Sequence, residues 1–155
     1  FGTPSLIGVV TGMVAGLATV TPASGYIGIP GGLILGFSGG LLCYLAVDYI
    51  RGKHQIDDSL DVFAVHGVGG VLGTLLVAFL ATSTFSGLGL PEGQTAISQF
   101  IVQFKAVVLA VIWTSVFTYL ILKATSLIVP LRVDEQEEIE GLDLRSHGEK
   151  GYHSD

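Results

Sequence analysis

The chain has 155 residues, of which 50% are hydrophobic and 13% are charged, and its formal net charge is −6 at pH 7. Soluble domains carry about 25% charged residues, so the composition excludes an ordinary soluble domain. The acidic balance argues against a nucleic-acid partner. The single cysteine, Cys43, excludes a disulfide framework and a cysteine metal cluster. Because no Asp, Glu, Lys, Arg or His occurs from Phe1 to Val47, we expect an integral membrane chain that lies in a lipid bilayer.

Four apolar segments are long enough to span a bilayer, which takes about 20 residues of helix. Thr21-Pro22 closes the first segment and Pro130 ends the fourth, because the residue before a proline is disfavoured in a helix. The sequence therefore predicts an all-α membrane protein, a multi-helix transmembrane bundle at 1–130 followed by a tail at 131–155. The spans are expected at about 5–20, 26–49, 60–81 and 96–129.

Charged residues in the loops predict the orientation of these spans. Arg51 lies between the second and third spans and Arg132 follows the fourth, whereas the loops at 21–29 and 82–95 contain no Lys or Arg. By the positive-inside rule, we expect the Arg51 loop and the carboxy-terminal tail to be cytoplasmic. The chain also opens without an initiator Met, a basic leader or a signal-peptide pattern. We therefore expect it to be the carboxy-terminal part of a longer protein.

Glycines recur at helical spacing in the first three spans. This small-xxx-small pattern lets membrane helices approach one another closely, so we expect a dense bundle. The glycines concerned are Gly8, Gly12 and Gly16; Gly28, Gly32, Gly36 and Gly40; and Gly69 and Gly73.

The third span begins with an acidic segment and carries a histidine. Asp58 or Ser59 can cap the helix, and Asp61 places a negative charge near the positive end of its dipole; an ion or substrate role for Asp61 is the alternative. His66 follows within an apolar run. An ionisable group at membrane depth is costly and usually functional. The residues expected on the same face of the helix are Val62, Gly69, Gly70, Gly73 and Val77.

His66 has three possible roles. In an apolar lumen the neutral imidazole is favoured, and its one donor and one acceptor nitrogen can bind a small substrate or relay a proton. Alternatively, the ring only forms a hydrogen bond to a neighbouring helix. A heme or metal ligand is the third possibility, although no second histidine lies within any predicted span. We expect no cofactor and no enzymatic activity.

Three motifs resemble the ammonium transporter family, which includes bacterial, methylammonium-permease and Rhesus members. The run DDSLDVFAVHGVGG at 57–70 is similar to the signature of the family's tenth helix, and TPASGYIG at 21–28 is similar to the turn between its eighth and ninth helices. The family's conserved cytoplasmic end is similar to three elements of the tail: EGLD at 140–143, HGE at 147–149 and Tyr152.

The resemblance implies a fold of eleven helices, assembled as a homotrimer with one pore in each protomer. This chain would supply the last four helices and the tail. His66 would be the second of the paired pore histidines, with Val62 in the same pore. Thr21 would lie near the outer pore mouth, and Asp61 would be structural.

The function implied is transport of ammonium or ammonia across the cell membrane through a hydrophobic pore. Neutral ammonia is much cheaper to desolvate than the cation, so the cation would lose its proton before it passes His66. An ammonium sensor on the same fold and a gas channel of the Rhesus type remain as alternatives.

The tail contains more acids than bases, and its composition alone predicts a disordered, solvated segment. Gly141 and Gly148 permit tight turns, which indicates more local order. The resemblance implies that this segment, with Asp143, is a regulatory element that receives a nitrogen-regulatory signal-transduction protein.

Overall fold

The computed structural model describes residues 6–149, which form helices, turns and loops without any strand. This architecture confirms the predicted all-α fold class. Ser5 and Tyr152, which belong to the first predicted span and to the tail motif, lie outside the described residues. The chain divides into two compact units, residues 1–109 and 110–155.

Within residues 6–149, four helical segments are long and apolar enough to cross a membrane. The elements of the first unit are α1 (Leu6–Val20), η1 (Thr21–Ala23), α2 (Ile29–Val47), η2 (Asp48–Lys53), η3 (Phe63–Gly67), α3 (Val68–Leu80), η4 (Ser83–Phe85) and the first part of α4 (Ala96–Ser126). Two of these short elements, η2 and η3, are π-helical and continue the spans of α2 and α3.

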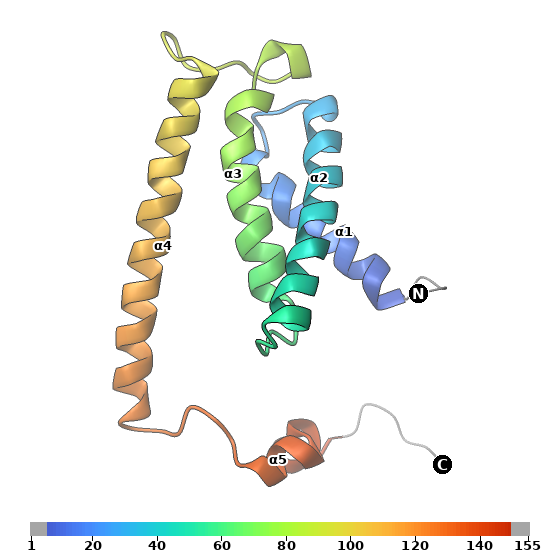
Figure 1. The fold of residues 1–155 in the computed structure, drawn as a ribbon, viewed down its shortest axis with the longest axis vertical. Helices are drawn as coiled ribbons and strands as arrows, with labels where there is room; N and C mark the ends of the chain where they lie inside the picture. Colours follow the sequence, from blue (N-terminus) through green and yellow to red (C-terminus); the bar gives the residue numbers. More distant parts are fainter. Residues whose placement is uncertain (1–5, 150–155) are drawn as a thin grey trace. The chain divides into compact units, whose positions relative to one another are not determined.

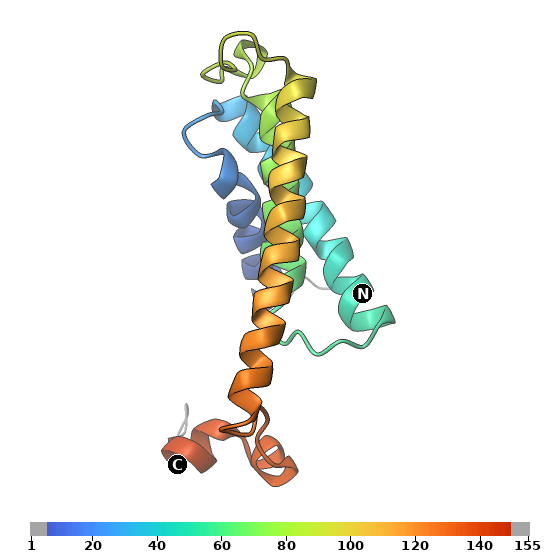
Figure 2. The same ribbon diagram turned by 90° about the vertical axis from the view of Figure 1, so that its left-hand side faces the viewer.

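The helices α1, α2 and α3 pack against one another. Figure 1 shows α2 beside α3, with α1 crossing them obliquely, and the start of α2 at the same end of the group as the loop that follows α3. In Figure 2, α1 and α2 diverge toward the opposite end, where η2 lies.

Hydrogen bonds join the two loops at the end of the group where α2 begins. The Leu88 N–H donates to the carbonyl of Tyr26 at 3.1 Å, and the Gly89 N–H donates to Ala81 at 2.8 Å. A Cβ atom on Gly28 would lie 2.6 Å from Cβ of Ser86, so only glycine permits this approach. The two loops therefore form one folded end cap.

Thr19 marks the point where the three helices come closest. Its side chain is fully buried, and its hydroxyl donates to the carbonyl of Ala15 at 2.8 Å. A Cβ atom on Gly69 would lie 2.8 Å from Thr19 Oγ1, and Cβ atoms on Gly39 and Gly73 would overlap the same threonine. Three glycines from two helices thus form the cage that holds Thr19.

The glycines that pack are only partly those expected from spacing. Gly69 and Gly73 make close contacts, as the dense-bundle prediction requires, and a Cβ on Gly16 would lie 3.4 Å from the carbonyl of Gly36. In α2 the buried face contains Gly31, Leu35, Gly39 and Cys43. A Cβ on Gly32 would meet nothing within 4 Å. The predicted stripe from Gly28 to Gly40 is therefore only half-buried, and although Gly28 and Gly36 make close approaches, the fully buried face is the neighbouring one.

The second unit comprises the remainder of α4, then α5 (Glu135–Glu140) and η5 (Asp143–His147). None of the side chains of α4 is buried. Asp134 caps α5, because its carboxylate accepts a hydrogen bond from the Glu137 N–H at 2.8 Å.

We expect Gly73→Ala to loosen the three-helix group, because the new methyl group would overlap the Thr19 backbone. Overpacking of this kind costs about 1–3 kcal/mol, measurable as a lower thermal unfolding midpoint of the chain in detergent. Gly70→Ala is the matched control in the same helix, since its Cβ would meet nothing within 4 Å. Equal midpoints for the two variants would contradict the close approach at Thr19.

Candidate functional site

His66 lies in the π-helical segment η3, which leads directly into α3. Its side chain is exposed, whereas Ala64 and Val65 in the same segment are 1% and 3% exposed. The thiol of Cys43 donates to the carbonyl of Val65 at 3.6 Å, which fixes the buried side of the segment against α2. The imidazole therefore projects from the face of this helix that α1 and α2 do not cover.

The residues predicted to share the pore face of this helix differ in exposure in the structure. Val62 is exposed like His66, but Gly69, Gly73 and Val77 are buried. A π-helical turn hydrogen-bonds to the fifth residue rather than the fourth, so it changes the rotation between the residues before it and those after it. An expectation based on uniform α-helical spacing misses this rotation.

Asp58 starts this span. Its carboxylate oxygens accept hydrogen bonds from the Val62 and Phe63 N–H groups at 2.8 and 2.9 Å, which satisfies two of the donors that a helix start leaves open. The hydroxyl of Ser59 instead donates to the carboxylate of Asp57.

Asp61 lies in a different environment from Asp58, the residue that caps the span. Its φ is +54°, in the left-handed region, and its carboxylate accepts a hydrogen bond from Arg51 Nη1 at 3.2 Å. Its side chain is 14% exposed and that of Arg51 is 51% exposed. Sequence reasoning used Arg51 only to orient the loops and missed it as the partner of Asp61.

Thr21 lies in η1, at the far end of α1. Its side chain is exposed and its hydroxyl donates to the carbonyl of Leu17 at 2.7 Å. The segment η1 contacts α3, and Pro22 lies near Gly73, about two helical turns beyond His66. The structure therefore does not bring Thr21 and His66 together.

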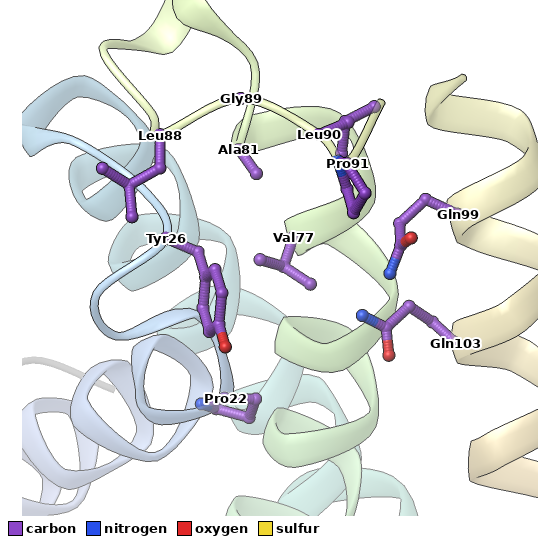
Figure 3. A pocket seen from close by; sticks show the side chains of 10 residues that line it. All are labelled: Pro22, Tyr26, Val77, Ala81, Leu88, Gly89, Leu90, Pro91, Gln99 and Gln103. Carbon is purple, nitrogen blue, oxygen red and sulfur yellow. The ribbon is translucent and has the colours of Figure 1, made fainter. Parts of the chain in front are cut away.

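A cavity of about 480 Å³ opens at this end of the first unit. In Figure 3, the Gln99 and Gln103 amides of α4 point into it, with Tyr26 on the other side. The sequence offered a signal for the two glutamines, which are polar residues one helical turn apart in an apolar span. The cavity has no charged lining residue; it is lined by Pro22, Tyr26, Val77, Ala81, Leu88, Gly89, Leu90, Pro91, Gln99 and Gln103.

A second cavity, of about 490 Å³, lies where α1 and α2 diverge. Asp61 contributes the one carboxylate of its lining, beside Thr11, Cys43 and Tyr44 and the glycines of both helices. Neither His66 nor Val62 lines this cavity or the first one. Within residues 6–149, no group of three or more His, Cys, Asp or Glu side chains could hold a metal ion.

The tail residues singled out in the sequence form local turns. Gly141 and Gly148 have φ values of +91° and +65°, a region that glycine adopts without strain. Asp143 opens η5, and its carbonyl accepts a hydrogen bond from the Glu149 N–H at 3.0 Å.

An ion pair braces the first turn of the tail. Arg132 donates to both carboxylate oxygens of Glu138, with Nη2 at 2.8 Å from Oε2. These hydrogen bonds hold the pKa of the Glu138 carboxyl below its ordinary value. Arg145 and Glu140 form a second pair at 3.5 Å.

Comparisons with known proteins agree on one family. The model of the Ammonium Transporter Family matches residues 1–152. Ammonium transporter Amt1 of Archaeoglobus fulgidus is 40% identical over 97% of this chain and 38% of its own length. The ammonium transporter of Bacillus subtilis is 37% identical over 96% of this chain and 37% of its own length.

A solved structure described as a sensor Amt protein superposes with a TM-score of 0.78 at 31% identity. The match covers 90% of this chain and 34% of that one. The chain thus spans less than two fifths of the length of the relatives that it matches.

We expect Arg132→Gln to raise the pKa of Glu138 toward its ordinary value, because the hydrogen bonds that favour the carboxylate are lost. In the unmodified chain the pair's stabilisation is present at neutral pH and is lost as the pH falls through the lowered pKa of Glu138. A ¹³C NMR titration of the Glu138 carboxyl measures both effects. Arg145→Gln is the control, and an unchanged Glu138 titration in Arg132→Gln would contradict the pairing.

Proposed function

Because the chain belongs to the ammonium transporter family, we propose that it forms part of a pore that moves ammonium or ammonia across the cell membrane. The match of the family model over residues 1–152 carries this proposal. Two features of the described residues support it: four segments able to cross a membrane, and an exposed histidine on one of them.

His66 is the residue proposed to meet the substrate, with Val62 beside it. A neutral imidazole presents one hydrogen-bond donor and one acceptor, which match the lone pair and the N–H groups of ammonia. Ammonium would lose its proton before it enters the apolar stretch, because the uncharged molecule costs far less to desolvate. Thr21 is proposed to lie near the outer mouth, at the other end of the first unit from the Arg51 loop.

The proposed assembly is a homotrimer of eleven-helix protomers, in which this chain supplies the last four helices. The chain covers 38% and 37% of the length of two relatives, which supports its being one part of a longer protomer. The Arg51 loop and the tail would face the cytoplasm under the positive-inside rule. The turns at Gly141, Asp143 and Gly148 would present the tail to a nitrogen-regulatory signal-transduction protein.

An ammonium sensor is the second candidate function, because the solved structure that matches this chain is described as a sensor. A sensor would bind ammonium without a sustained flux. Uptake of labelled methylammonium by proteoliposomes that contain the complete protein separates the two functions.

We expect His66→Ala in the complete transporter to lower methylammonium uptake about tenfold, the loss expected when one substrate hydrogen bond of about 1.4 kcal/mol is removed. His54→Ala is the matched control. That exposed histidine lies in the loop after η2, with its ring 4.6 Å from Tyr49. Uptake by His66→Ala at the unmodified rate would refute the proposed pore role.

We expect the 155-residue chain alone to give no ammonium flux in liposomes, because the proposed partner histidine lies on a helix outside it. The measurement is internal alkalinisation or acidification after an ammonium jump, with empty liposomes as the blank. Clear flux through the chain alone would mean that a paired-histidine pore is not required.

A further inference from the structure

The span that carries His66 begins with a residue in an uncommon backbone conformation. Asp61 has a φ of +54°, which a residue with a side chain rarely adopts, although aspartate tolerates it better than most. A conformation of this kind persists where surrounding contacts hold it. The Asp61 N–H donates to the carbonyl of Asp58 at 3.0 Å, and the side chain forms an ion pair with Arg51, whose Nη1 lies 3.2 Å from Oδ1 and 3.5 Å from Oδ2 of Asp61.

The backbone of Asp61 is the first support of the π-helical segment. Its carbonyl accepts a hydrogen bond from the Val65 N–H at 2.8 Å. If Asp61 relaxed to a negative φ, this carbonyl would turn and the bond to Val65 would be lost. The dihedral angles of Asp61 are therefore coupled to the rotation of the helical turn that follows.

That rotation decides where the imidazole points. Val65 is 3% exposed and faces Cys43, while its neighbour His66 is exposed. A modest turn of the segment about its axis would move Val65 out of its packing and carry His66 toward the covered side.

We propose that Arg51 and Asp61 form a positioning pair that sets the orientation of His66. The ion pair holds Asp61 in the left-handed conformation, and Asp61 in turn fixes the rotation of η3. Neither residue touches the substrate. The inference rests on the proposed function only in assigning His66 to the pore; the orientation itself is a property of this chain.

The cap by Asp58 is a separate device. Its carboxylate binds the N–H groups of Val62 and Phe63, so it secures the start of the helix. Because the side chain of Arg51 is half exposed, we expect its pair with Asp61 to affect the local conformation of Asp61 and not the global stability of the chain. Loss of the pair should therefore change the orientation of His66 without unfolding the chain.

The test compares three substitutions in the full chain in lipid nanodiscs, read by the ¹⁵N and ¹³C NMR signals of the His66 ring. Asp61→Ala and Arg51→Gln are expected to shift or split these signals. Asp61→Gly is expected to keep them close to their original positions, because glycine adopts a positive φ without help. In the Asp61→Gly background, Arg51→Gln should have no further effect.

Asp57→Ala is the matched control, since that carboxylate in the same acidic segment accepts a hydrogen bond from Ser59 and not from Arg51. Unchanged His66 signals in Arg51→Gln would overturn the proposal. It would also be overturned if Asp61→Gly disturbed the ring as much as Asp61→Ala, because the backbone conformation would then not be the link.

Uptake separates this inference from the proposed function. In the complete transporter, Arg51→Gln is expected to lower the maximal uptake rate about threefold to tenfold, the range for loss of one orienting interaction, with little change in KM. Shifted His66 signals together with unaltered uptake would support the positioning pair and refute the pore role of His66. Unshifted signals would refute the positioning pair whatever the uptake.

Discussion

The close approach of three helices around Thr19 is the constraint on which the first unit depends. A hydroxyl in an apolar interior must have a hydrogen-bond partner, and the carbonyl of Ala15 supplies it within the same helix. The neighbouring helices need only offer space, which Gly39, Gly69 and Gly73 provide. Small residues of this kind let van der Waals contact hold helices together in lipid, where the hydrophobic effect gives no drive between them.

This packing buries one side of α3, and α1 and α2 do not cover the other side, where Phe79 lies 5.6 Å from Phe100 of α4 between ring centroids. Gly69, Gly73 and Val77 are buried, so the side chains that start the span must project elsewhere. The π-helical turn at η3 makes this possible within a few residues, because Val65 packs against Cys43 while His66 does not. Single π-helical turns are common at functional sites, since they change the direction of one side chain without breaking the helix.

Helical class and the existence of four spans followed from the sequence, because the length of an apolar run decides both. The predictions that were wrong or incomplete concern the rotation of a helix about its axis and contacts between residues that lie far apart in the sequence. The spacing of small residues in α2 is compatible with two different buried faces. It could not show that the face with Gly31 and Gly39 would be the buried one. A π-helical turn leaves no signature in the spacing of apolar residues, so the predicted face of His66, which extended to Gly69 and Gly73, was wrong. The partner of Asp61 lies ten residues away across a loop, beyond the reach of periodicity.

For the tail, composition predicted less order than the structure shows. Its described part contains a capped helix, two left-handed glycines and two ion pairs. All these contacts join residues within six positions of one another, so the entropy of closing each loop is small. Ile139 is nonetheless 79% exposed, and no hydrophobic core supports the segment. Its order therefore comes from hydrogen bonds and exposed charges, and it weakens as salt screens them.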